Sequence, residues 1–250
     1  MSQTVQRALS IVEFIAERPR SLGEVAGHLG VHRSTALRLL HTLREGGFAR
    51  IVGGRYTVGL RLVALAHQAL DQLDLHPVAH PHLVRLADRH GHTVHLAQLV
   101  GDEIVYVDKV DGRGALRLSS RVGRPVNPQT SGVGKAILAY LDEASRERFL
   151  ARISYQAYTA TSITSPEALR AELARTAARG WAEDDGEYEE VVACVAAPVR
   201  DARGRVVAAV SVTAPRVLAP LERLRGCLPD LTDTCAAISR DLGWTGGDQP

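Results

Sequence analysis

The sequence predicts an α+β protein with an N-terminal winged helix-turn-helix and a larger mixed domain after it. The first part is indicated by residues 21–38, which read as two short helices around a glycine turn, and by two β-like runs that follow them. The second part is indicated by strands with hairpin turns that occur both before and after a block of helices.

The helix-turn-helix pattern begins at Ser21, which can form an S-x-x-E capping box with Glu24. Apolar residues then recur at helical spacing up to Gly30, where a tight turn favours a residue that tolerates positive φ. In the next helix the apolar side chains face inward, and a polar and cationic set faces outward: Ser34, Thr35, Arg38, His41 and Thr42. A DNA recognition helix needs this arrangement. An ordinary helical hairpin with a solvated face is the alternative.

The elements around this motif favour the DNA-binding interpretation, because their order is that of a winged helix. Phe48–Ile51 and Arg55–Val58 are short β-like runs on either side of Gly53–Gly54, which predicts a hairpin wing. A first helix is expected at Gln3–Arg18, where Pro19 ends it. Its buried stripe is expected to contain Val5, Leu9, Val12 and either Ile15 or Ala16.

Charge is distributed unevenly along the chain, whose overall net charge is +2. Residues 1–60 carry eight arginines and four glutamates, and therefore +4, whereas the remainder carries −2. We expect the basic N-terminal domain, residues 1–58, to contact double-stranded DNA. The residues expected to do so are Arg33, Ser34, Thr35, Arg38, Thr42, Arg50 and Arg55. Because this positive excess is modest, tight binding implies that a dimer presents the domain in duplicate.

The composition, with 45% hydrophobic and 23% charged residues among 250, is typical of a globular protein. No apolar run approaches the ~20 residues that span a bilayer, and the N-terminus has no hydrophobic signal core. We therefore expect a cytoplasmic protein without a membrane partner. The three cysteines show no C-x-x-C spacing, so neither a disulfide framework nor a zinc ribbon is indicated.

The rest of the chain divides into a linker helix, a sensor domain and a tail. Residues 59–75 carry apolar side chains around much of the helix, so we expect this linker to pack on its own wing and on a partner's N-terminal domain. Residues 76–245 form the expected α+β sensor domain, and residues 246–250 a polar tail. The expected elements of the sensor domain are a helix that ends at Gly91, strands Thr93–Leu99, Ile104–Val110 and Leu116–Ser120, helices Ser131–Leu141, Arg146–Ile153 and Pro166–Arg179, strands Val191–Arg200 and Val206–Thr213, and a helix Leu221–Leu242 broken near Pro229.

A ligand site is expected at the Gly/Pro-rich loop Arg121–Lys135, which delivers the chain to the start of a helix. Free N–H groups at Ser131–Gly134 and the helix dipole favour a carboxylate there. The loop is not a P-loop, because Gln129 replaces the first glycine and Ala136 replaces the magnesium-binding Ser or Thr. A structural loop before an ordinary capped helix is the alternative.

A second set of polar residues is expected near this ligand. Asp184 and Asp185 lie in an acidic loop, and Ser211 and Thr213 alternate onto one face of the last strand. Cys194 lies in an apolar strand, where a buried inert thiol is the simpler interpretation. A dry pocket with a few convergent polar groups would suit a small-molecule ligand.

An enzyme that uses Cys194 as a redox or nucleophilic residue is the alternative class of function. Such chemistry needs a base beside the thiol or a second cysteine nearby. Cys227 and Cys235, however, lie far along the chain on a different element. The G-x-S-x-G and H-E-x-x-H motifs are absent. We therefore predict no catalytic residues, no cofactor and no enzyme activity.

Six of the ten histidines lie between His76 and His95, which raises the question of a metal site. His76 and His80 are four residues apart, but Pro77 and Pro81 are expected to disrupt the helix that would align them. The remaining histidines straddle a glycine or alternate on a strand. No metal site is therefore predicted.

Taken together, these segments closely resemble the IclR family of bacterial transcriptional regulators over nearly the whole chain. The matching segments include SLGEVAGHLGVHRSTALRLLHTLREGGF, LRLSSRVGRPVNPQTSGVGKAILAYL, VVACVAAPV and GRVVAAVSVTAPR. The resemblance implies a winged-helix domain, a linker helix and a GAF-like effector-binding domain. It also implies homodimers, often paired into tetramers, on palindromic promoter DNA, and effectors that are small organic acids, aromatic compounds or sugar-derived metabolites.

By position, the resemblance implies effector contacts at Gly132, Val133, Asp184, Cys194, Ser211 and Thr213. The chain departs from the family at Glu189–Val191, where the usual acidic loop contains a glycine, and at Leu37, where the family often has His or Tyr. We expect a ligand-responsive repressor of a catabolic or metabolic operon, with an activator of the same family as the alternative.

Overall fold

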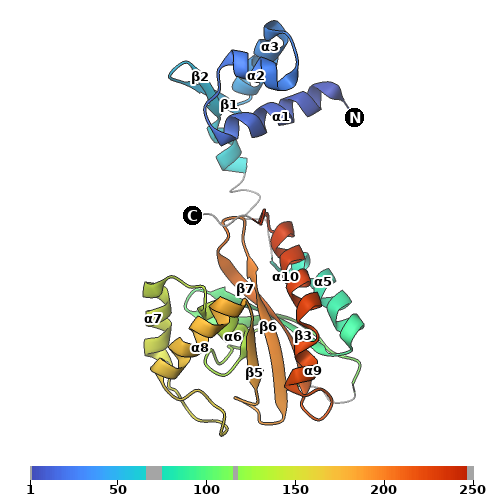
Figure 1. Ribbon diagram of the computed structural model, residues 1–250, viewed down its shortest axis with the longest axis vertical. Coiled ribbons are helices and arrows are strands. Elements are labelled where there is room, and N and C mark those ends of the chain that lie inside the picture. The colour runs from blue at the N-terminus through green and yellow to red at the C-terminus, as the bar shows by residue number, and fades with distance from the viewer. Residues whose placement is uncertain (1, 66–74, 115–117, 247–250) are drawn as a thin grey trace. The chain divides into compact units, whose positions relative to one another are not determined.

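The computed structural model describes residues 2–65, 75–114 and 118–246. The chain divides into two compact units, Met1–Leu73 and Asp74–Pro250 (Figure 1). Helices accompany a two-stranded sheet in the first unit and a five-stranded sheet in the second, which confirms the predicted α+β class. None of the helices formed by the described residues has the length and the apolar composition of a membrane-spanning segment.

The first unit contains a winged helix-turn-helix. Its elements are α1 (Gln3–Glu17), α2 (Leu22–Leu29), α3 (Arg33–Glu45) and the antiparallel strands β1 (Ala49–Val52) and β2 (Arg55–Val58). The predicted capping box is present, because Glu24 N–H donates to Ser21 Oγ at 3.3 Å and Ser21 N–H donates to Glu24 Oε2 at 2.8 Å. Gly30 follows α2 with a φ of 60°, the left-handed conformation that favours glycine.

The core of the first unit forms where its helices meet the wing. Ile11 and Ile15 provide the fully buried side chains of α1. Ile15 is buried as predicted, whereas Val5 and Leu9, which were predicted in the same stripe, are 57% and 59% exposed, so these two assignments are wrong. Leu9 is rotated by about 160° from Ile11 around a regular helix, and the two side chains therefore lie on different faces.

The chain after the wing is helical at residues 60–65, whereas residues 66–74 of the predicted linker lie outside the described residues. Gly59 N–H donates to the Phe48 carbonyl at 2.8 Å. A Cβ atom at Gly59 would lie 1.9 Å from the Gly47 carbonyl oxygen, so only glycine fits at this position. The start of the linker therefore lies against the segment that enters the wing. Its packing on a partner's domain stays a prediction.

The second unit is built on an antiparallel five-stranded sheet with the strand order β4-β3-β7-β6-β5. The strands are β3 (Thr93–Val100), β4 (Glu103–Val110), β5 (Ala182–Asp185), β6 (Val192–Arg200) and β7 (Val206–Pro215). The helices are α5 (Leu75–His90), α6 (Gly132–Leu138), α7 (Glu143–Arg152), α8 (Pro166–Arg179), α9 (Leu221–Arg225) and α10 (Leu228–Asp241).

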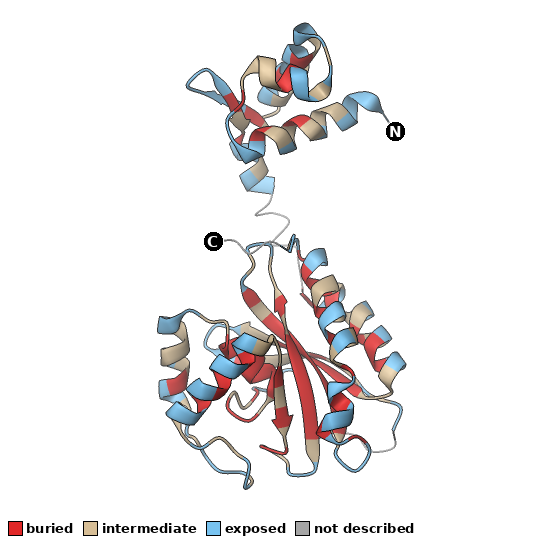
Figure 2. Cartoon of the chain, viewed as in Figure 1, coloured by how far each residue is buried: buried red, intermediate tan, exposed pale blue. Residues whose placement is uncertain are grey.

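Helices cover both faces of this sheet, with α5, α9 and α10 on one face and α6, α7 and α8 on the other (Figure 1). Alternation along β6 directs Val195 and Val199 to the first face, and Cys194 and Ala196 to the α6 side. The central strands β6 and β7 are covered on both faces, and they are buried along most of their length (Figure 2). This double coverage explains their nearly continuous apolar sequences.

Two predicted segments of the second unit are wrong. Leu118–Ser120 is not a strand, and the rest of the predicted strand Leu116–Ser120 lies outside the described residues. Asp184–Asp185 belongs to β5 rather than to a loop, because this segment pairs with β6. The last helix is broken at Gly226–Cys227, two residues before Pro229, which confirms the predicted break. Pro229 lies in the first turn of α10, where its missing N–H has no helical partner to lose.

Helix α5 contains both prolines that were predicted to disrupt it. Pro77 lies in the first turn of this helix, where the backbone N–H groups have no partner within the helix. Pro81 removes one helical hydrogen bond further along, and the helix continues past it to His90. His76 and His80 therefore lie one turn apart on one continuous helix.

Candidate DNA-binding surface and effector cavity

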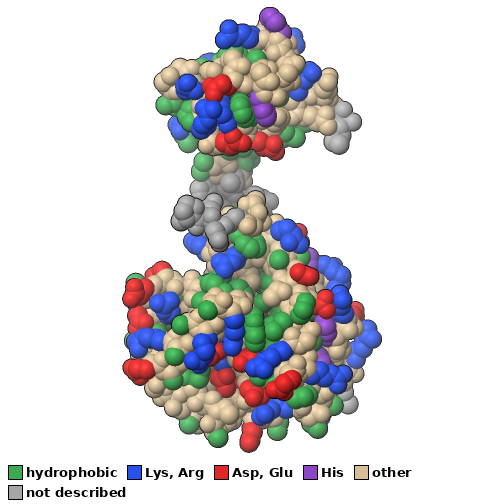
Figure 3. All heavy atoms as spheres, in the orientation of Figure 1, with side chains coloured by type: hydrophobic (Ala, Val, Ile, Leu, Met, Phe, Trp, Pro, Cys, Tyr) green, Lys and Arg blue, Asp and Glu red, His purple; other side chains and the backbone are tan. Residues whose placement is uncertain are grey.

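The residues predicted to contact DNA lie on α3 and on the wing of the first unit, where several arginine side chains reach the surface (Figure 3). Six of the seven are exposed and Thr35 is half-buried; the six are Arg33, Ser34, Arg38, Thr42, Arg50 and Arg55. Leu37 is 46% exposed and does not pack inward, so it offers an apolar surface to a thymine methyl group. This set combines groups that can read base edges with arginines that can bind phosphates.

Two of these residues, Ser34 and Arg55, already have hydrogen-bond or ion-pair partners within the first unit. His32 Nδ1 accepts the Ser34 N–H at 3.3 Å and lies 2.9 Å from Ser34 Oγ, so His32 caps α3. His32 was not predicted, because histidine is not among the preferred N-cap residues. Arg55 Nη1 lies 3.1 Å from Glu24 Oε2, and hydrogen bonds from Ser21 lower the pKa of Glu24 to about 2. An ionised Glu24 therefore holds the wing arginine in the DNA-free protein.

The second unit contains a cavity of about 300 Å³ between the sheet and the start of α6. All six residues expected to contact an effector line this cavity: Gly132, Val133, Asp184, Cys194, Ser211 and Thr213. They come from α6, β5, β6 and β7, so the fold brings together segments that are far apart in the sequence. The volume lies at the lower end of the range for small-molecule sites, about 300–1,000 Å³.

A buried histidine forms the polar floor of this cavity together with strand hydroxyl groups. His95 in β3 lies with Nε2 2.7 Å from Ser120 Oγ, and with Nδ1 3.3 Å from Thr213 Oγ1 and 3.4 Å from Ser211 Oγ. Burial, followed by the charge of Lys109, lowers the pKa of His95 to about 3, so its imidazole is uncharged at neutral pH. The sequence prediction missed this role. A polar histidine within an apolar strand could have indicated this role. Its pairing with Ser211, however, follows only from the register of β3 against β7.

Helix α6 begins so close to β6 that no side chain fits at its first residue. A Cβ atom at Gly132 would lie 2.7 Å from Cys194 Sγ and 3.2 Å from the Ala196 Cβ. Gly132 therefore has a packing reason to be glycine, whether or not it contacts a ligand. Burial, and then the nearby Asp184, raise the pKa of the Cys194 thiol, so this group is protonated at neutral pH.

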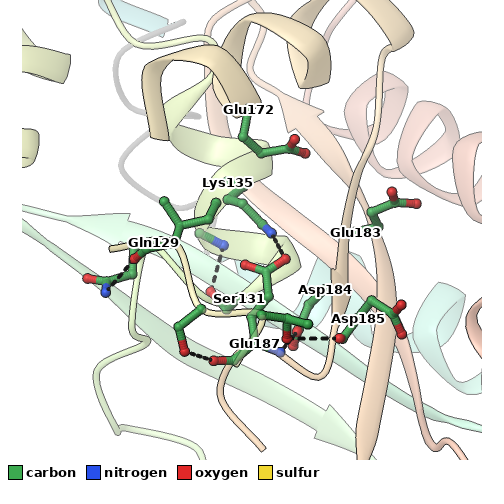
Figure 4. A network of polar contacts seen from close by, with 12 residues as sticks. Gln129, Ser131, Lys135, Glu172, Glu183, Asp184, Asp185 and Glu187 are labelled. Carbon is green, nitrogen blue, oxygen red and sulfur yellow. Dashed lines mark hydrogen bonds and ion pairs between the residues drawn. The ribbon is translucent and has the colours of Figure 1, made fainter. Parts of the chain in front are cut away.

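Asp184 on the cavity wall belongs to a buried polar network (Figure 4). Its Oδ1 accepts the Glu187 N–H at 2.7 Å, and Glu187 Oε1 lies 2.5 Å from Lys135 Nζ of α6. Burial raises the pKa of Asp184 to about 7, although the Glu187 N–H and the Lys135 charge both oppose this shift. Asp184 therefore titrates close to neutral pH.

Two arginines and three tyrosines, including Tyr106, also line the cavity, and none of them was predicted as a site residue. Arg121 and Arg124 are exposed and lie in the loop before α6. Tyr158 and Tyr188 place their rings 4.8 Å apart. The signal for the arginines was present, because both belong to the loop that was predicted to bind a ligand.

The start of α6 is a weaker anion-binding feature than predicted. Ser131 Oγ accepts the Gly134 N–H at 3.1 Å, which satisfies one of the N–H groups that were expected to bind a carboxylate. The helix spans only Gly132–Leu138, so the dipole of its peptide groups is short. The side chains of Arg121 and Arg124 carry full charges and are the stronger anion-binding groups of the cavity.

Comparison with known families and proteins identifies the class of this chain. Residues 67–240 match the family model of the bacterial transcriptional regulator IclR C-terminal domain, and residues 4–52 match the IclR helix-turn-helix domain. The chain belongs to the IclR family of bacterial transcriptional regulators. This result confirms the resemblance noted in the sequence and the predicted class of function.

Individual members of the IclR family are similar over most of their length. The HTH-type transcriptional regulator XynR of Escherichia coli is 33% identical over 246 residues, which cover 97% of this chain and 98% of XynR. The transcriptional repressor IclR of the same organism is 34% identical over 219 residues, which cover 85% of this chain and 80% of that repressor. The crystal structure of Thermotoga maritima IclR has a TM-score of 0.66 at 33% identity, covering 96% of this chain and 99% of that one.

These IclR-family relatives are transcriptional regulators, and none of their names points to catalysis. The environment of Cys194 agrees with them, because a reactive thiol needs a lowered pKa. Burial and Asp184 shift the pKa of this thiol in the opposite direction.

Proposed function

We propose that this IclR-family regulator is a repressor of a metabolic operon, binds a palindromic operator as a dimer, and responds to a small carboxylic acid in the cavity of its second unit. One observation carries the proposal: a chain with a winged helix also holds a cavity with an uncharged polar floor and two arginines. The name of its relative, the transcriptional repressor IclR, supports repression. Activation is the alternative sign of regulation.

The uncharged groups of the cavity floor favour a ligand with a small apolar body, and Arg121 and Arg124 favour a carboxylate, although Asp184 and Glu189 line the same cavity. His95, Tyr106 and Cys194 are uncharged at neutral pH, because burial lowers the pKa of the histidine and raises the pKa of the other two groups. Thr130 is buried, and its Oγ1 has no hydrogen-bond partner in the described chain, so it is available to a ligand oxygen. The nearby Arg121 supplies positive charge for the carboxylate.

Exposed apolar side chains on the first unit support a homodimer or a dimer of dimers. Val5 and Leu9 of α1, and Leu60, Val63 and Leu65 after the wing, are each 40% or more exposed. Burying them against a second copy would stabilise the dimer by about 25 cal/mol for each Å² of apolar surface. Two copies would also double the +4 charge of the first 60 residues that faces DNA. We place the regulator in the cytoplasm, where its DNA target lies.

Fluorescence anisotropy with a labelled duplex from the region upstream of the gene for this chain tests the proposal, with a scrambled duplex of the same length as the control. Specific, salt-sensitive binding that one compound from a panel of small organic acids releases is the expected result. The acid shifts DNA binding only if it binds the DNA-free and DNA-bound states with different affinities. Equal binding to scrambled and natural duplexes from several promoters would overturn the proposal. Specific binding that no acid alters would refute the carboxylate effector alone.

A further inference from the structure

Two histidines and an aspartate form a cluster near the start of the second unit, and none of the three lines the effector cavity. His76 and His80 are four residues apart on α5, so their side chains project from one face of the helix. Their rings stack with centroids 5.3 Å apart and an interplanar angle of 25°. Both histidines contact Asp108 of β4, the edge strand of the sheet.

The nitrogen and oxygen atoms of this cluster are spaced as the ligands of a small metal ion. His76 Nε2 lies 3.5 Å from Asp108 Oδ1, and His80 Nδ1 lies 2.7 Å from Asp108 Oδ2. One such atom from each residue lies within 4.8 Å of the other two. Ligand atoms around a tetrahedral zinc ion, with bonds of about 2.0–2.1 Å, are about 3.3 Å apart. Small side-chain rotations would bring the three groups to this spacing.

Asp108 is a buried carboxyl group that a bound cation would stabilise. Its side chain is only 6% exposed, and the Lys109 N–H donates to its Oδ1 at 2.7 Å and fixes the orientation of the carboxylate. The adjacent ammonium group does not neutralise this charge, because Lys109 Nζ binds the Leu118 and Ser120 carbonyls and lies 3.1 Å from Asp111. The two imidazole side chains, 48% and 45% exposed, keep the cluster accessible to an ion from solvent.

Ordinary histidine–carboxylate pairs on the same helix differ from this cluster. His82 Nε2 lies 2.7 Å from Asp241, and His90 Nε2 lies 3.0 Å from Asp230, so each of these carboxylates holds one histidine. Asp108 holds two. Ligand atoms from two imidazoles and one carboxylate therefore converge at a single point, where one cation can contact all three groups.

We propose that His76, His80 and Asp108 bind one divalent transition-metal ion of the zinc type, with water at the remaining position. Two imidazoles and one carboxylate favour such an ion over magnesium or calcium, which prefer oxygen ligands. The ion ties the first turns of α5 to the edge strand β4. Because it binds the folded chain, it stabilises the second unit by mass action.

The test is a zinc titration of the untagged, full-length chain after removal of metal with a chelator. Competition with a chromogenic zinc indicator gives the affinity, cobalt absorption gives the coordination geometry, and magnesium is the control ion. The wild-type chain is expected to bind one equivalent at this site, with a zinc-dependent rise in the midpoint of thermal unfolding. His76→Gln and His80→Gln are expected to weaken zinc binding by at least about tenfold.

His82→Gln is the matched control, because it removes a histidine–aspartate pair from the same helix and is expected to leave zinc affinity unchanged. Thermal unfolding without metal establishes that each variant is folded. If one variant fails to fold, the other still removes a ligand. Zinc binding that is equal in wild type, His76→Gln and His80→Gln would overturn the proposal. The absence of zinc binding by the folded wild-type chain would also overturn it.

Discussion

Lys135 Nζ lies 2.5 Å from Glu187 Oε1, in an ion pair that joins α6 to the segment following Asp184. The lysine side chain is 1% exposed and the glutamate side chain is 12% exposed, so both charges have lost most of their hydration. Glu187 Oε2 is buried and has no hydrogen-bond partner in the described chain. The pair therefore stabilises the packing of α6 against the segment after Asp184 only while both charges are present.

Removing one partner of this pair is expected to destabilise the protein strongly. Lys135→Met leaves Glu187 as an uncompensated buried charge and should lower the free energy of unfolding by about 3–5 kcal/mol. Combining it with Glu187→Leu should recover part of this loss. Urea denaturation measures the free energy of unfolding of the single and the double variant. Arg170→Met breaks an exposed pair with Glu147 and is the control, expected to leave stability nearly unchanged. Similar losses for the buried and exposed pairs would contradict the prediction.

Gly132 is expected to resist substitution for a packing reason. In Gly132→Ala, the new Cβ would meet Cys194 Sγ at 2.7 Å, which should lower the free energy of unfolding by about 1–3 kcal/mol in thermal denaturation. Adding Cys194→Ala removes the sulfur and should restore part of this loss. Gly27→Ala in α2 is the control, because its new Cβ would meet no atom within 4 Å apart from the neighbouring backbone of its own helix. A Gly132→Ala protein as stable as wild type would refute the close approach of α6 to β6.

Asp184→Asn tests whether this buried carboxyl group titrates near neutral pH. Burial raises its pKa from 3.8 to about 7, so between these values the folded chain holds a proton that the unfolded chain has released. The stability that this proton contributes is fully present below about pH 4 and is lost as the pH rises through about 7. At about 1.4 kcal/mol for each pKa unit, the loss is at most roughly 4 kcal/mol.

Asparagine keeps the oxygen that accepts the Glu187 N–H but does not ionise. Between about pH 5 and pH 8, the Asp184→Asn protein should therefore lose less stability than wild type. Urea denaturation of both proteins at the two pH values measures this difference. Identical pH dependences would show that Asp184 does not titrate in this range.

The two arginines predicted to bind DNA should differ in their effects. Arg38→Ala is expected to weaken operator binding by about 1–3 kcal/mol and to relax specificity if this side chain contacts a guanine. Arg55→Ala is expected to weaken binding to all duplexes and to reduce the salt slope by about 1, as the loss of one phosphate contact would. Anisotropy over a series of salt concentrations distinguishes these outcomes. The same pattern for both variants would contradict the assigned roles.

Glu24→Gln tests whether the ion pair between Glu24 and Arg55 competes with DNA for the wing arginine. Glutamine keeps the capping-box geometry but removes the negative charge that lies 3.1 Å from Arg55. It should therefore strengthen binding to all duplexes. Unchanged affinity would show that this ion pair does not compete with DNA.

The features predicted well from the sequence are those with strong local signals. The capping box at Ser21 and the glycine turn at Gly30 depend on a few neighbouring residues, and both are present. The alternation of Ser211 and Thr213 within a strand also places both at the cavity. The winged helix could be predicted because all its parts are short and consecutive.

The features that were missed depend on tertiary packing. His95 joins the cavity floor through the register of β3 against β7, which no local pattern reports. The acidic composition of β5 favours a loop, and this segment becomes a strand only by pairing with β6. Pro77 and Pro81 were expected to disrupt the helix that would align His76 and His80, yet packing of α5 against β3 and β4 maintains that helix. That error also hid the proximity of His76 and His80.

The most direct test of the account compares the effector response of wild type and Ser211→Ala. Ser211 is 2% exposed, lines the cavity and belongs to the second unit, whereas the predicted DNA contacts belong to the first. Operator binding by both proteins is measured by anisotropy while the acid that releases wild type is titrated. Ser211→Ala should bind the operator with unchanged affinity and need an acid concentration about tenfold higher for release, because it loses a hydrogen bond to the ligand. Equal release midpoints for the two proteins would contradict the claim that this cavity controls DNA binding.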